Sequence, residues 1–327
     1  MKDFSYSRAN SLDEAKQLAS RSDVMLLAGG TTLIDLAKCG VATPEMVVDI
    51  TRLKGLDAVK VDRDGAYLGA LAKMSHVADN AHIRASFPAI SEALWQAASA
   101  QLRNMATIGG NLMQRTRCGY FRDPLSFPAC NKRSPGSGCA ALGGVTRNHA
   151  VLGTSPDCIA TNPGDLAVAL AAFDAQLHAG DRRIAVDDFF LLPGATPDRE
   201  HALEAGEIIT AVTIPASAAA QRSTYLKVRD RQSYEFAAAS AAVGLEFEAD
   251  GKTIRDVRVA LGGVATKPWR ARGVEASLKG KTFEPEALKR ASLLAMESAA
   301  AQGDNHYKID LAPRVIVRAL MKVGGIA

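Results

Sequence analysis

Four of the five cysteines lie in one segment, residues 114–162, in which Gly, Pro, Ser, Arg and Asn are frequent and no helix or strand periodicity persists. They are Cys118, Cys130, Cys139 and Cys158. In a large chain without an export signal, such a group is typical of a metal or redox site rather than of a disulfide framework. A loop of this length inside a compact chain needs a reason, either disorder or function, and the four cysteines favour a cluster or a metal. Cys39 lies elsewhere and is expected to be a buried, inert thiol.

The spacing of the four cysteines and the charges near them favour an iron–sulfur cluster. Zinc sites usually contain a Cys-x-x-Cys pair, and the sequence has none. The spacing also differs from that of ferredoxins. Four thiolates on a [4Fe–4S] core leave a net negative charge, which nearby cations would offset. These cations are Arg115, Arg117, Arg122, Lys132, Arg133 and Arg147, and they outnumber Asp123 and Asp157. Zinc, and thiols that are free or joined in disulfides, remain alternatives.

Two glycine pairs stand beside Thr or Asn residues, in the sequences AGGTT (28–32) and ATIGGN (106–111). Paired glycines let successive backbone N–H groups face one way and let a phosphate approach closely. A single pair is more often an ordinary strand-to-helix turn, but two such loops favour one diphosphate held from two sides. No Rossmann fingerprint is present, and GKT at 280–282 lacks the glycine that a Walker A motif requires before it.

The segments around these loops predict an α+β chain. A capping box at Ser11 and Glu14 starts a helix, and the apolar run 24–28 is a strand that leads into the first glycine pair. Further strands are expected at 46–50, 66–70, 208–214, 224–228, 237–247 and 253–261. Further helices are expected at 31–38, 75–81, 87–100, 165–174, 285–300 and 312–323, with a linker at 216–222. Strands followed by helices near the end of the chain describe a compact α+β domain with three strands.

Composition limits the class of protein. The chain has 327 residues, of which 47% are hydrophobic and 23% charged, as in globular proteins of about two domains. A net charge of +4 does not indicate nucleic-acid binding. No uncharged stretch approaches the roughly 18 residues that a membrane helix needs. The N-terminus lacks the apolar region of a signal peptide, so we expect any export to depend on a partner.

Five segments together resemble the FAD-binding medium subunit of the xanthine dehydrogenase family of molybdenum hydroxylases. They are LAGGTTL (27–33), ATIGGN (106–111), IATNPGDLA (159–167), YLKVR (225–229) and ALGGVATKP (260–268). The cysteine segment departs from xanthine dehydrogenase. It is similar to the flavin subunit of periplasmic aldehyde oxidoreductases, which holds an additional [4Fe–4S] cluster, and, with different spacing, to 4-hydroxybenzoyl-CoA reductases.

The resemblance implies a fold and a set of site residues. Residues 1–217 would form a two-part FAD-binding domain of the vanillyl-alcohol-oxidase type, with a [4Fe–4S]-binding insertion at about 114–162, and residues 222–327 the small α+β domain. The flavin would be held by Leu27, Ala28, Gly29, Gly30, Thr31, Thr32, Ala106, Thr107, Gly109, Gly110, Asn111, Asp165 and Lys227. Without the resemblance, Asp165 would be a helix-stabilising acid and Lys227 a solvated charge. The cluster ligands would be Cys118, Cys130, Cys139 and Cys158.

The resemblance also implies a function and partners. A large subunit would oxidise an aldehyde with water at a molybdenum cofactor, and a small subunit with two [2Fe–2S] clusters would pass the electrons to the FAD of this chain and on to an external acceptor. No catalytic residue beyond the flavin is then expected here. A xanthine dehydrogenase or hydroxybenzoyl-CoA reductase subunit is an alternative, and so is a zinc-stabilised assembly subunit without flavin. Assembly is expected in the cytoplasm, without membrane insertion, and export to the periplasm would require a signal-bearing partner.

Overall fold

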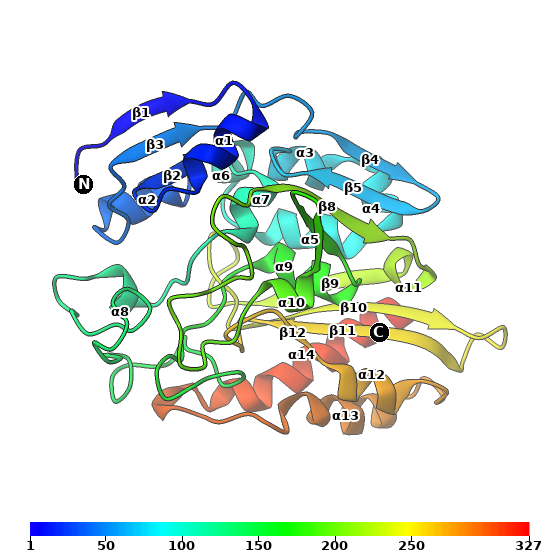
Figure 1. Ribbon diagram of the computed structural model, residues 1–327. Coiled ribbons are helices and arrows are strands. Elements are labelled where there is room, and N and C mark those ends of the chain that lie inside the picture. Colours follow the sequence, from blue (N-terminus) through cyan, green and yellow to red (C-terminus); the bar gives the residue numbers. More distant parts are fainter. Residues whose placement is uncertain (327) are drawn as a thin grey trace.

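The computed structural model describes residues 1–326, which form three packed parts (Figure 1). The first part contains β1 (Ser5–Arg8), α1 (Leu12–Ala19), β2 (Val24–Leu27), α2 (Leu33–Lys38) and β3 (Met46–Asp49). Its strands form a parallel sheet in the order β1-β3-β2. The predicted helix start is confirmed, since the Ser11 hydroxyl accepts a hydrogen bond from the Glu14 amide at 3.1 Å. β2 ends at the first glycine pair, as predicted.

The second part is a five-stranded antiparallel sheet with helices. It contains β4 (Val59–Asp62), β5 (Gly65–Gly69), α3 (Met74–Asp79), α4 (Ala81–Ser86), α5 (Pro88–Gln96), α6 (Ala100–Met105), α7 (Ile108–Leu112), α9 (Asp165–Ala172), β6 (Gln176–Ala179), β7 (Arg182–Ala185), α10 (Val186–Phe189) and β8 (Ile209–Pro215). The strand order is β4-β5-β8-β6-β7. The helix predicted over 87–100 is interrupted, because Ala98 takes a left-handed conformation (φ +51°) that its sequence does not signal.

The third part contains α11 (Ala218–Gln221), β9 (Ser223–Val228), β10 (Ala239–Phe247), β11 (Ile254–Gly262), β12 (Trp269–Arg270), α12 (Arg272–Leu278), α13 (Pro285–Leu293) and α14 (Tyr307–Gly324). Its antiparallel sheet has four strands, in the order β12-β11-β10-β9, so the expected three-stranded sheet is wrong. The fourth strand pairs only Trp269 and Arg270 with β11 and is too short to produce an alternating pattern. The final helix begins at Tyr307, earlier than predicted, and contains Pro313.

The sheet of the third part is covered on both faces, which joins it to the second part. Ala242 and Ala260 belong to the core that contains the fully buried helix α9, whereas Val243 and Val259 belong to the core formed with α13 and α14. Because alternate residues of a strand point to opposite faces, one sheet separates the two cores. Figure 1 shows β9–β12 between α9 and α14.

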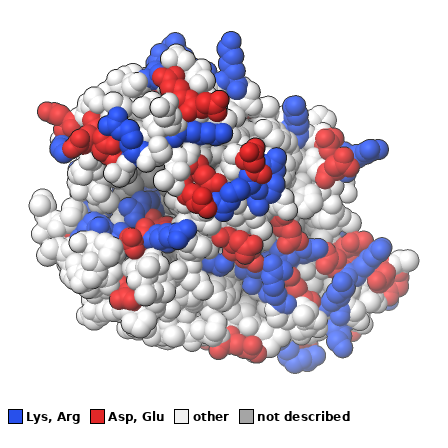
Figure 2. All heavy atoms as spheres, in the orientation of Figure 1, with Lys and Arg blue, Asp and Glu red and all other residues white. Residues whose placement is uncertain are grey.

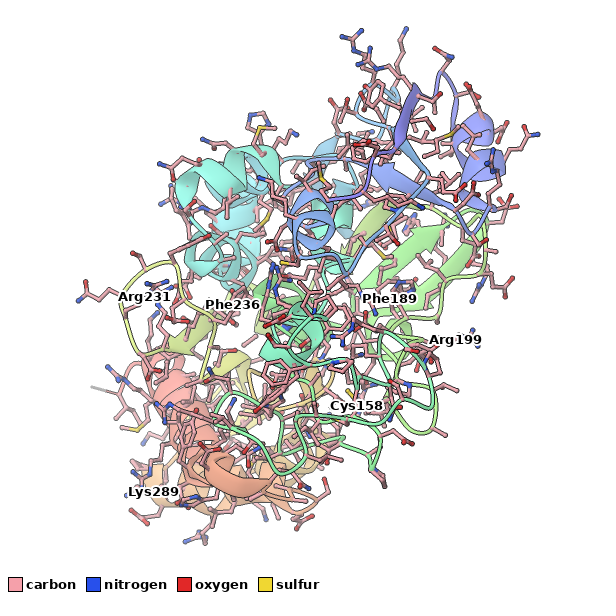
Figure 3. The ribbon with its side chains drawn as sticks, turned by 90° about the vertical axis from the view of Figure 1, so that its left-hand side faces the viewer. Cys158, Phe189, Arg199, Arg231, Phe236 and Lys289 are labelled. Carbon is pink, nitrogen blue, oxygen red and sulfur yellow. The ribbon has the colours of Figure 1, made fainter. Side chains whose placement is uncertain are left out.

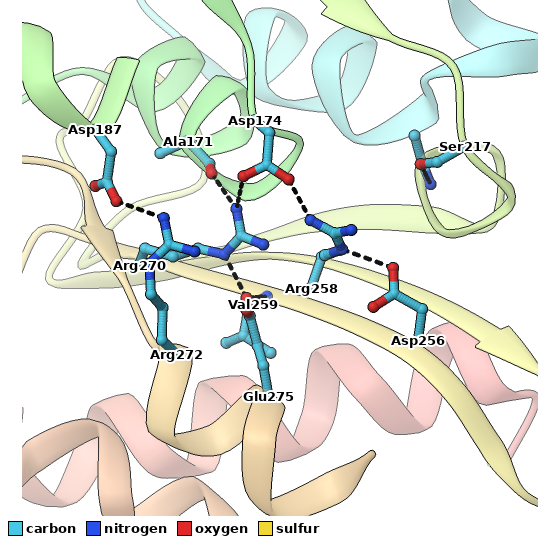
Figure 4. A network of polar contacts seen from close by, with 11 residues as sticks. Ala171, Asp174, Asp187, Ser217, Asp256, Arg258, Val259, Arg270, Arg272 and Glu275 are labelled. Atoms are coloured by element: carbon cyan, nitrogen blue, oxygen red, sulfur yellow. Dashed lines mark hydrogen bonds and ion pairs between the residues drawn. The ribbon is translucent and has the colours of Figure 1, made fainter. Parts of the chain in front are cut away.

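A polar network also joins these two parts (Figure 4). The side chain of Arg270 is almost fully buried and donates to the Ala171 carbonyl at 2.6 Å and to the Asp174 carboxylate at 3.0 Å. Arg258 pairs with the same carboxylate, and Arg272 pairs with Asp187 at 2.8 Å. These contacts fix the end of α9 against β11 and β12, and α10 against α12, so the helix that starts at Asp165 has a defined position.

The cysteine segment forms a folded insertion with little regular structure, at the lower left of Figure 1. It contains one short helix, α8 (Gly119–Arg122). Arg133 donates to the carbonyls of Tyr120 at 2.5 Å and Phe121 at 2.6 Å. The Asn131 side chain accepts from the Gly138 amide at 2.8 Å. Hydrogen bonds from side chains to the backbone therefore take the place of the regular backbone hydrogen bonds of helices and strands.

The surface agrees with the composition. Lys and Arg side chains are interspersed with Asp and Glu over the face shown in Figure 2. Among the helices of residues 1–326, none is both long and apolar enough to cross a membrane.

Candidate flavin and iron–sulfur sites

The two glycine loops lie against each other, although 80 residues separate them in the sequence. A Cβ atom added to Gly29 would lie 2.2 Å from the carbonyl oxygen of Met105 and 3.0 Å from the Cα of Ala106. Only glycine permits this approach of two backbones. Gly30 follows with φ +73°, a conformation that glycine adopts without strain. The structure therefore brings the predicted pair of loops into one site.

The second loop presents polar groups that the protein leaves unused. Thr107 caps α7, and its hydroxyl accepts from the Gly110 amide at 3.2 Å. The Asn111 amide nitrogen contacts the Met74 sulfur at 3.5 Å, while the buried oxygen of the same side chain has no partner within residues 1–326. Thr32 precedes α2 but does not cap it with its hydroxyl. The hydroxyl hydrogens of Thr32 and Thr107 can donate to a phosphate. The backbone amides of residues 108–111 already donate within the protein, and the free Asn111 oxygen is an acceptor, so the second loop offers side-chain donors rather than open amides.

A cleft lies next to Asp165, between the second part, the third part and the insertion. It contains about 1350 Å³ of empty space, part of which is open to solvent. Its lining comes from residues 116–120, Val145 and residues 147–149 of the insertion, from residues 161–165 and Val168, and from Asp230, residues 235–238, Ser240, Gly262 and Gly263. Figure 3 shows the loop that carries Arg231 and Phe236 at one side of the molecule and Cys158 further toward its centre. Phe236 packs on Arg117 with 5.0 Å from the guanidinium carbon to the ring centroid.

Asp165 and Lys227, which come from different domains, form a buried ion pair. The Lys227 ammonium lies 2.8 Å from the Asp165 carboxylate and also donates to the Gln96 carbonyl at 3.1 Å. The Tyr225 hydroxyl donates to the other carboxylate oxygen at 2.5 Å. Burial raises the pKa of Asp165, and the ammonium and the hydroxyl oppose that rise. Lys227 is therefore not the solvated charge expected without the resemblance. Tyr225 was not predicted, although its position two residues before Lys227 places both on one face of β9.

Breaking this pair is expected to destabilise the chain. Asp165→Asn leaves the Lys227 cation buried without a counter-charge, which should lower the free energy of unfolding by about 3–5 kcal/mol. Lys227→Met should have a similar effect, and the double variant should recover part of the loss. Urea unfolding of the flavin-depleted chain measures it, so that altered flavin affinity does not contribute. Glu286→Gln, which breaks the exposed pair with Lys289, is the control and should leave the midpoint unchanged. A wild-type midpoint for Asp165→Asn would refute the pair's role in stability.

The four cysteines of the insertion line one small cavity. Cys118, Cys130, Cys139 and Cys158 all contribute to its wall, together with Lys132, and all are free thiols. Cys130 and Cys139 face each other across a single antiparallel bridge. Among residues 1–326, no group of three or more His, Cys, Asp or Glu side chains is placed to hold a metal ion, so the four thiols share a cavity without forming a closed metal site.

Two of the four thiols, those of Cys118 and Cys158, favour the protonated form without a metal. Burial raises the pKa of Cys118 to about 11 and also raises the pKa of Cys158. The Cys158 sulfur accepts from the Ala160 amide at 3.5 Å, a contact that favours a thiolate. The cavity supplies the number of cysteines that a [4Fe–4S] cluster takes.

The cations around the insertion are largely paired with acids from outside it, which the sequence could not show. Glu200 lies between Arg115 at 2.5 Å and Lys132 at 2.7 Å. These two cations lower the pKa of Glu200 against the effect of its burial. Asp35 pairs with Arg117 at 3.0 Å and with Arg122. The expected surplus of positive charge is therefore smaller than the insertion alone suggests.

Cys39 lies outside the cavity, as predicted. It ends α2, and its sulfur lies 3.9 Å from the Arg122 guanidinium. It is only partly buried, so the expectation of a buried thiol is wrong. The position at a helix end near the surface explains the difference.

Two family matches cover almost the whole chain. Residues 2–217 match the FAD binding domain in molybdopterin dehydrogenase, and residues 224–323 match the CO dehydrogenase flavoprotein C-terminal domain. The chain belongs to the FAD-binding medium subunits of the molybdenum hydroxylases. Membership in this family makes it an oxidoreductase subunit that binds FAD, and the two glycine loops and the cleft are the features of the structure that fit this cofactor.

Several relatives within the family are known. The chain is 43% identical to the aldehyde oxidoreductase FAD-binding subunit PaoB of Escherichia coli K12, over 98% of each chain. It is 29% identical to the glyceraldehyde dehydrogenase medium chain of Sulfolobus acidocaldarius, over 88% of this chain and 85% of that one. Among solved structures, carbon monoxide dehydrogenase from Hydrogenophaga pseudoflava superposes with a TM-score of 0.76 at 25% identity, over 99% of this chain and 98% of that one.

Proposed function

We propose that this chain is the FAD- and [4Fe–4S]-binding electron-transfer subunit of a molybdenum-containing aldehyde oxidoreductase. The observation that carries the choice of substrate class is the 43% identity to the E. coli aldehyde oxidoreductase subunit over nearly the full length of both chains. Residues 1–217 form the FAD-binding domain, of the vanillyl-alcohol-oxidase type, and residues 222–327 the C-terminal domain.

The chain's own residues bind and orient the flavin. The loops at Leu27–Thr32 and Ala106–Asn111 hold the diphosphate between them, with the hydroxyls of Thr31, Thr32 and Thr107 and the amide nitrogen of Asn111 as side-chain donors. Asp165 and Lys227 lie beside the cleft and fix its wall where the two domains meet. The flavin supplies the redox chemistry, and the protein positions it. Neither glycine loop contains a His or Cys that could form a covalent bond to flavin.

Cys118, Cys130, Cys139 and Cys158 hold the [4Fe–4S] cluster. Their shared cavity supports this assignment, and the absence of a Cys-x-x-Cys pair argues against zinc. The cluster supplies one-electron transfer when bound and also ties together four separate turns of the insertion.

The proposal requires partners, because we assign no substrate centre to this chain. A large subunit with the molybdenum cofactor oxidises the aldehyde, and a small subunit with two [2Fe–2S] clusters delivers the electrons. An external acceptor removes them from FAD. Assembly takes place in the cytoplasm, where cofactors are inserted, and any export depends on a partner's signal. A large subunit that acts on xanthine or on a hydroxybenzoyl-CoA is the alternative, and the substrates that the purified complex oxidises distinguish the two.

The test is to purify the chain with its co-isolating subunits and to assay cofactors and activity together. The complex should oxidise aldehydes, contain molybdenum and release one FAD per medium chain on denaturation. The chain alone should bind FAD and oxidise no aldehyde. Aldehyde oxidation by the isolated chain would refute the arrangement. Turnover of xanthine but not of aldehydes would refute the substrate class, and flavin that stays with the denatured precipitate would refute non-covalent binding.

A further inference from the structure

His149 is a buried residue of the insertion that contacts one of the four cysteines. Only 6% of it is exposed, and its Nε2 atom lies 3.2 Å from the Cys118 sulfur. Its backbone is fixed from two sides. The His149 amide donates to the Thr146 carbonyl at 2.7 Å, and the side chain of Asn305 donates to the carbonyls of His149 and Ala150 at 3.4 and 3.1 Å. The imidazole is therefore held beside the sulfur by the fold.

The chemistry of the pair determines which atom donates. A cysteine sulfur that ligates a cluster carries no proton, so it can only accept a hydrogen bond. The Nε2 atom must then carry the hydrogen, which leaves Nδ1 as an acceptor. Nδ1 is buried and has no partner among residues 1–326. Within the described residues, the ring nitrogens of His149 therefore form one polar contact, the one between Nε2 and the Cys118 sulfur.

The pair also lies between the two sites described above. Cys118 and Tyr120 line both the four-cysteine cavity and the cleft beside Asp165, and His149 lines the cleft. The Tyr120 and His149 rings are 5.9 Å apart. The wall that separates the proposed cluster from the flavin cleft is therefore built from Cys118 and its immediate neighbours.

We propose that His149 is a positioning residue of the iron–sulfur centre, whose Nε2–H hydrogen bond to the Cys118 sulfur raises the reduction potential of the cluster. This inference rests on the proposed function, in which Cys118 is a ligand. One-electron reduction adds a negative charge to a cluster that is already an anion. A fixed donor at a ligand sulfur stabilises the reduced form more than the oxidised form, and hydrogen bonds to the sulfurs are one of the factors that set such potentials.

The experiment compares three variants in the purified complex. His149→Phe keeps a ring of similar size but removes the donor, whereas His149→Gln retains an N–H group near the sulfur. His201→Phe is the matched control. His201 is also largely enclosed and has a partnerless Nδ1, but it stacks on Phe189 and forms no hydrogen bond to a cysteine in the part of the chain that the structure describes. The readouts are iron and FAD per chain and the midpoint potential of the reduced cluster's electron paramagnetic resonance signal.

His149→Phe is expected to keep FAD and iron and to lower the midpoint potential, while His149→Gln and His201→Phe stay close to wild type. An unchanged potential in His149→Phe would overturn the inference. If His149→Phe loses its iron, the result for His149→Gln decides. Wild-type iron content and midpoint potential in His149→Gln support the hydrogen bond, whereas loss of iron in His149→Gln overturns the inference. A wild-type complex whose medium chain holds no cluster would instead refute the proposed function.

Discussion

Replacing any one of Cys118, Cys130, Cys139 and Cys158 by serine is expected to remove most of the iron bound by this chain. A [4Fe–4S] cluster normally takes four thiolates, and the cavity offers four. Serine supplies a hydroxyl that remains protonated near neutral pH and cannot replace the thiolate. The iron and acid-labile sulfide of the medium chain, measured in the purified complex, should therefore fall together in all four variants.

The same substitutions should loosen the insertion. Residues 114–162 contain one helix, of four residues, so few regular backbone hydrogen bonds stabilise the segment. A cluster that joins four separate turns closes several loops at once, and its binding free energy becomes folding free energy. Limited proteolysis should cut the four variants within the insertion at protease concentrations that leave the wild type intact.

Cys39→Ser is the control for both measurements. Cys39 lies outside the cavity, next to Arg122, and its replacement should change neither iron content nor proteolysis. Full iron in a Cys130→Ser variant would contradict the assignment. One zinc ion per chain in place of iron and sulfide would contradict it as well and would favour the zinc alternative.

Much of the fold could be predicted because local signals agree with the packing. The capped helix after Ser11 and the strand before Gly29 occur where the pattern places them. The strands of the third part were also recognisable, since they are long apolar runs covered on both faces. The break at Ala98 and the two-residue strand β12 were not predictable, because a left-handed alanine and a single pair of bridging residues leave no periodic signal.

The site was predictable to the extent that its residues are adjacent in the sequence. The glycine loops and the cysteines can be recognised from local patterns, whereas their neighbours come from distant segments. Glu200 reaches the insertion from the loop after α10, and Asp35 reaches it from α2. No pattern around either acid indicates this role, because ion pairs across a fold depend on tertiary packing. The same reason explains why His149 could not be recognised as a neighbour of Cys118.

Gly110→Val is expected to reduce bound FAD several-fold while the chain stays folded. A Cβ atom at this position would meet only the Thr107 hydroxyl, at 2.9 Å. The main effect on folding should therefore be a weaker N-terminal cap of the five-residue helix α7. The added branch would instead occupy the space beside the Thr107 hydroxyl, where we propose that the diphosphate binds. A tenfold loss of affinity corresponds to about 1.4 kcal/mol, and one steric conflict of this kind is sufficient for it.

Two further glycines make this experiment specific. Gly29→Ala places its Cβ against the Met105 carbonyl, so it should separate the loops and lower both FAD content and thermal stability. Gly273→Val lies in α12, outside the cleft, where a Cβ meets Leu294 at an ordinary 3.7 Å, and it should preserve FAD. FAD is measured by its absorbance after release from a known amount of chain, and folding by thermal unfolding. If Gly110→Val keeps full flavin while Gly29→Ala loses it, the second loop only supports the first and does not contact the phosphates. Loss of FAD in Gly110→Val at a wild-type melting temperature, with Gly273→Val unchanged, is the result that direct contact requires.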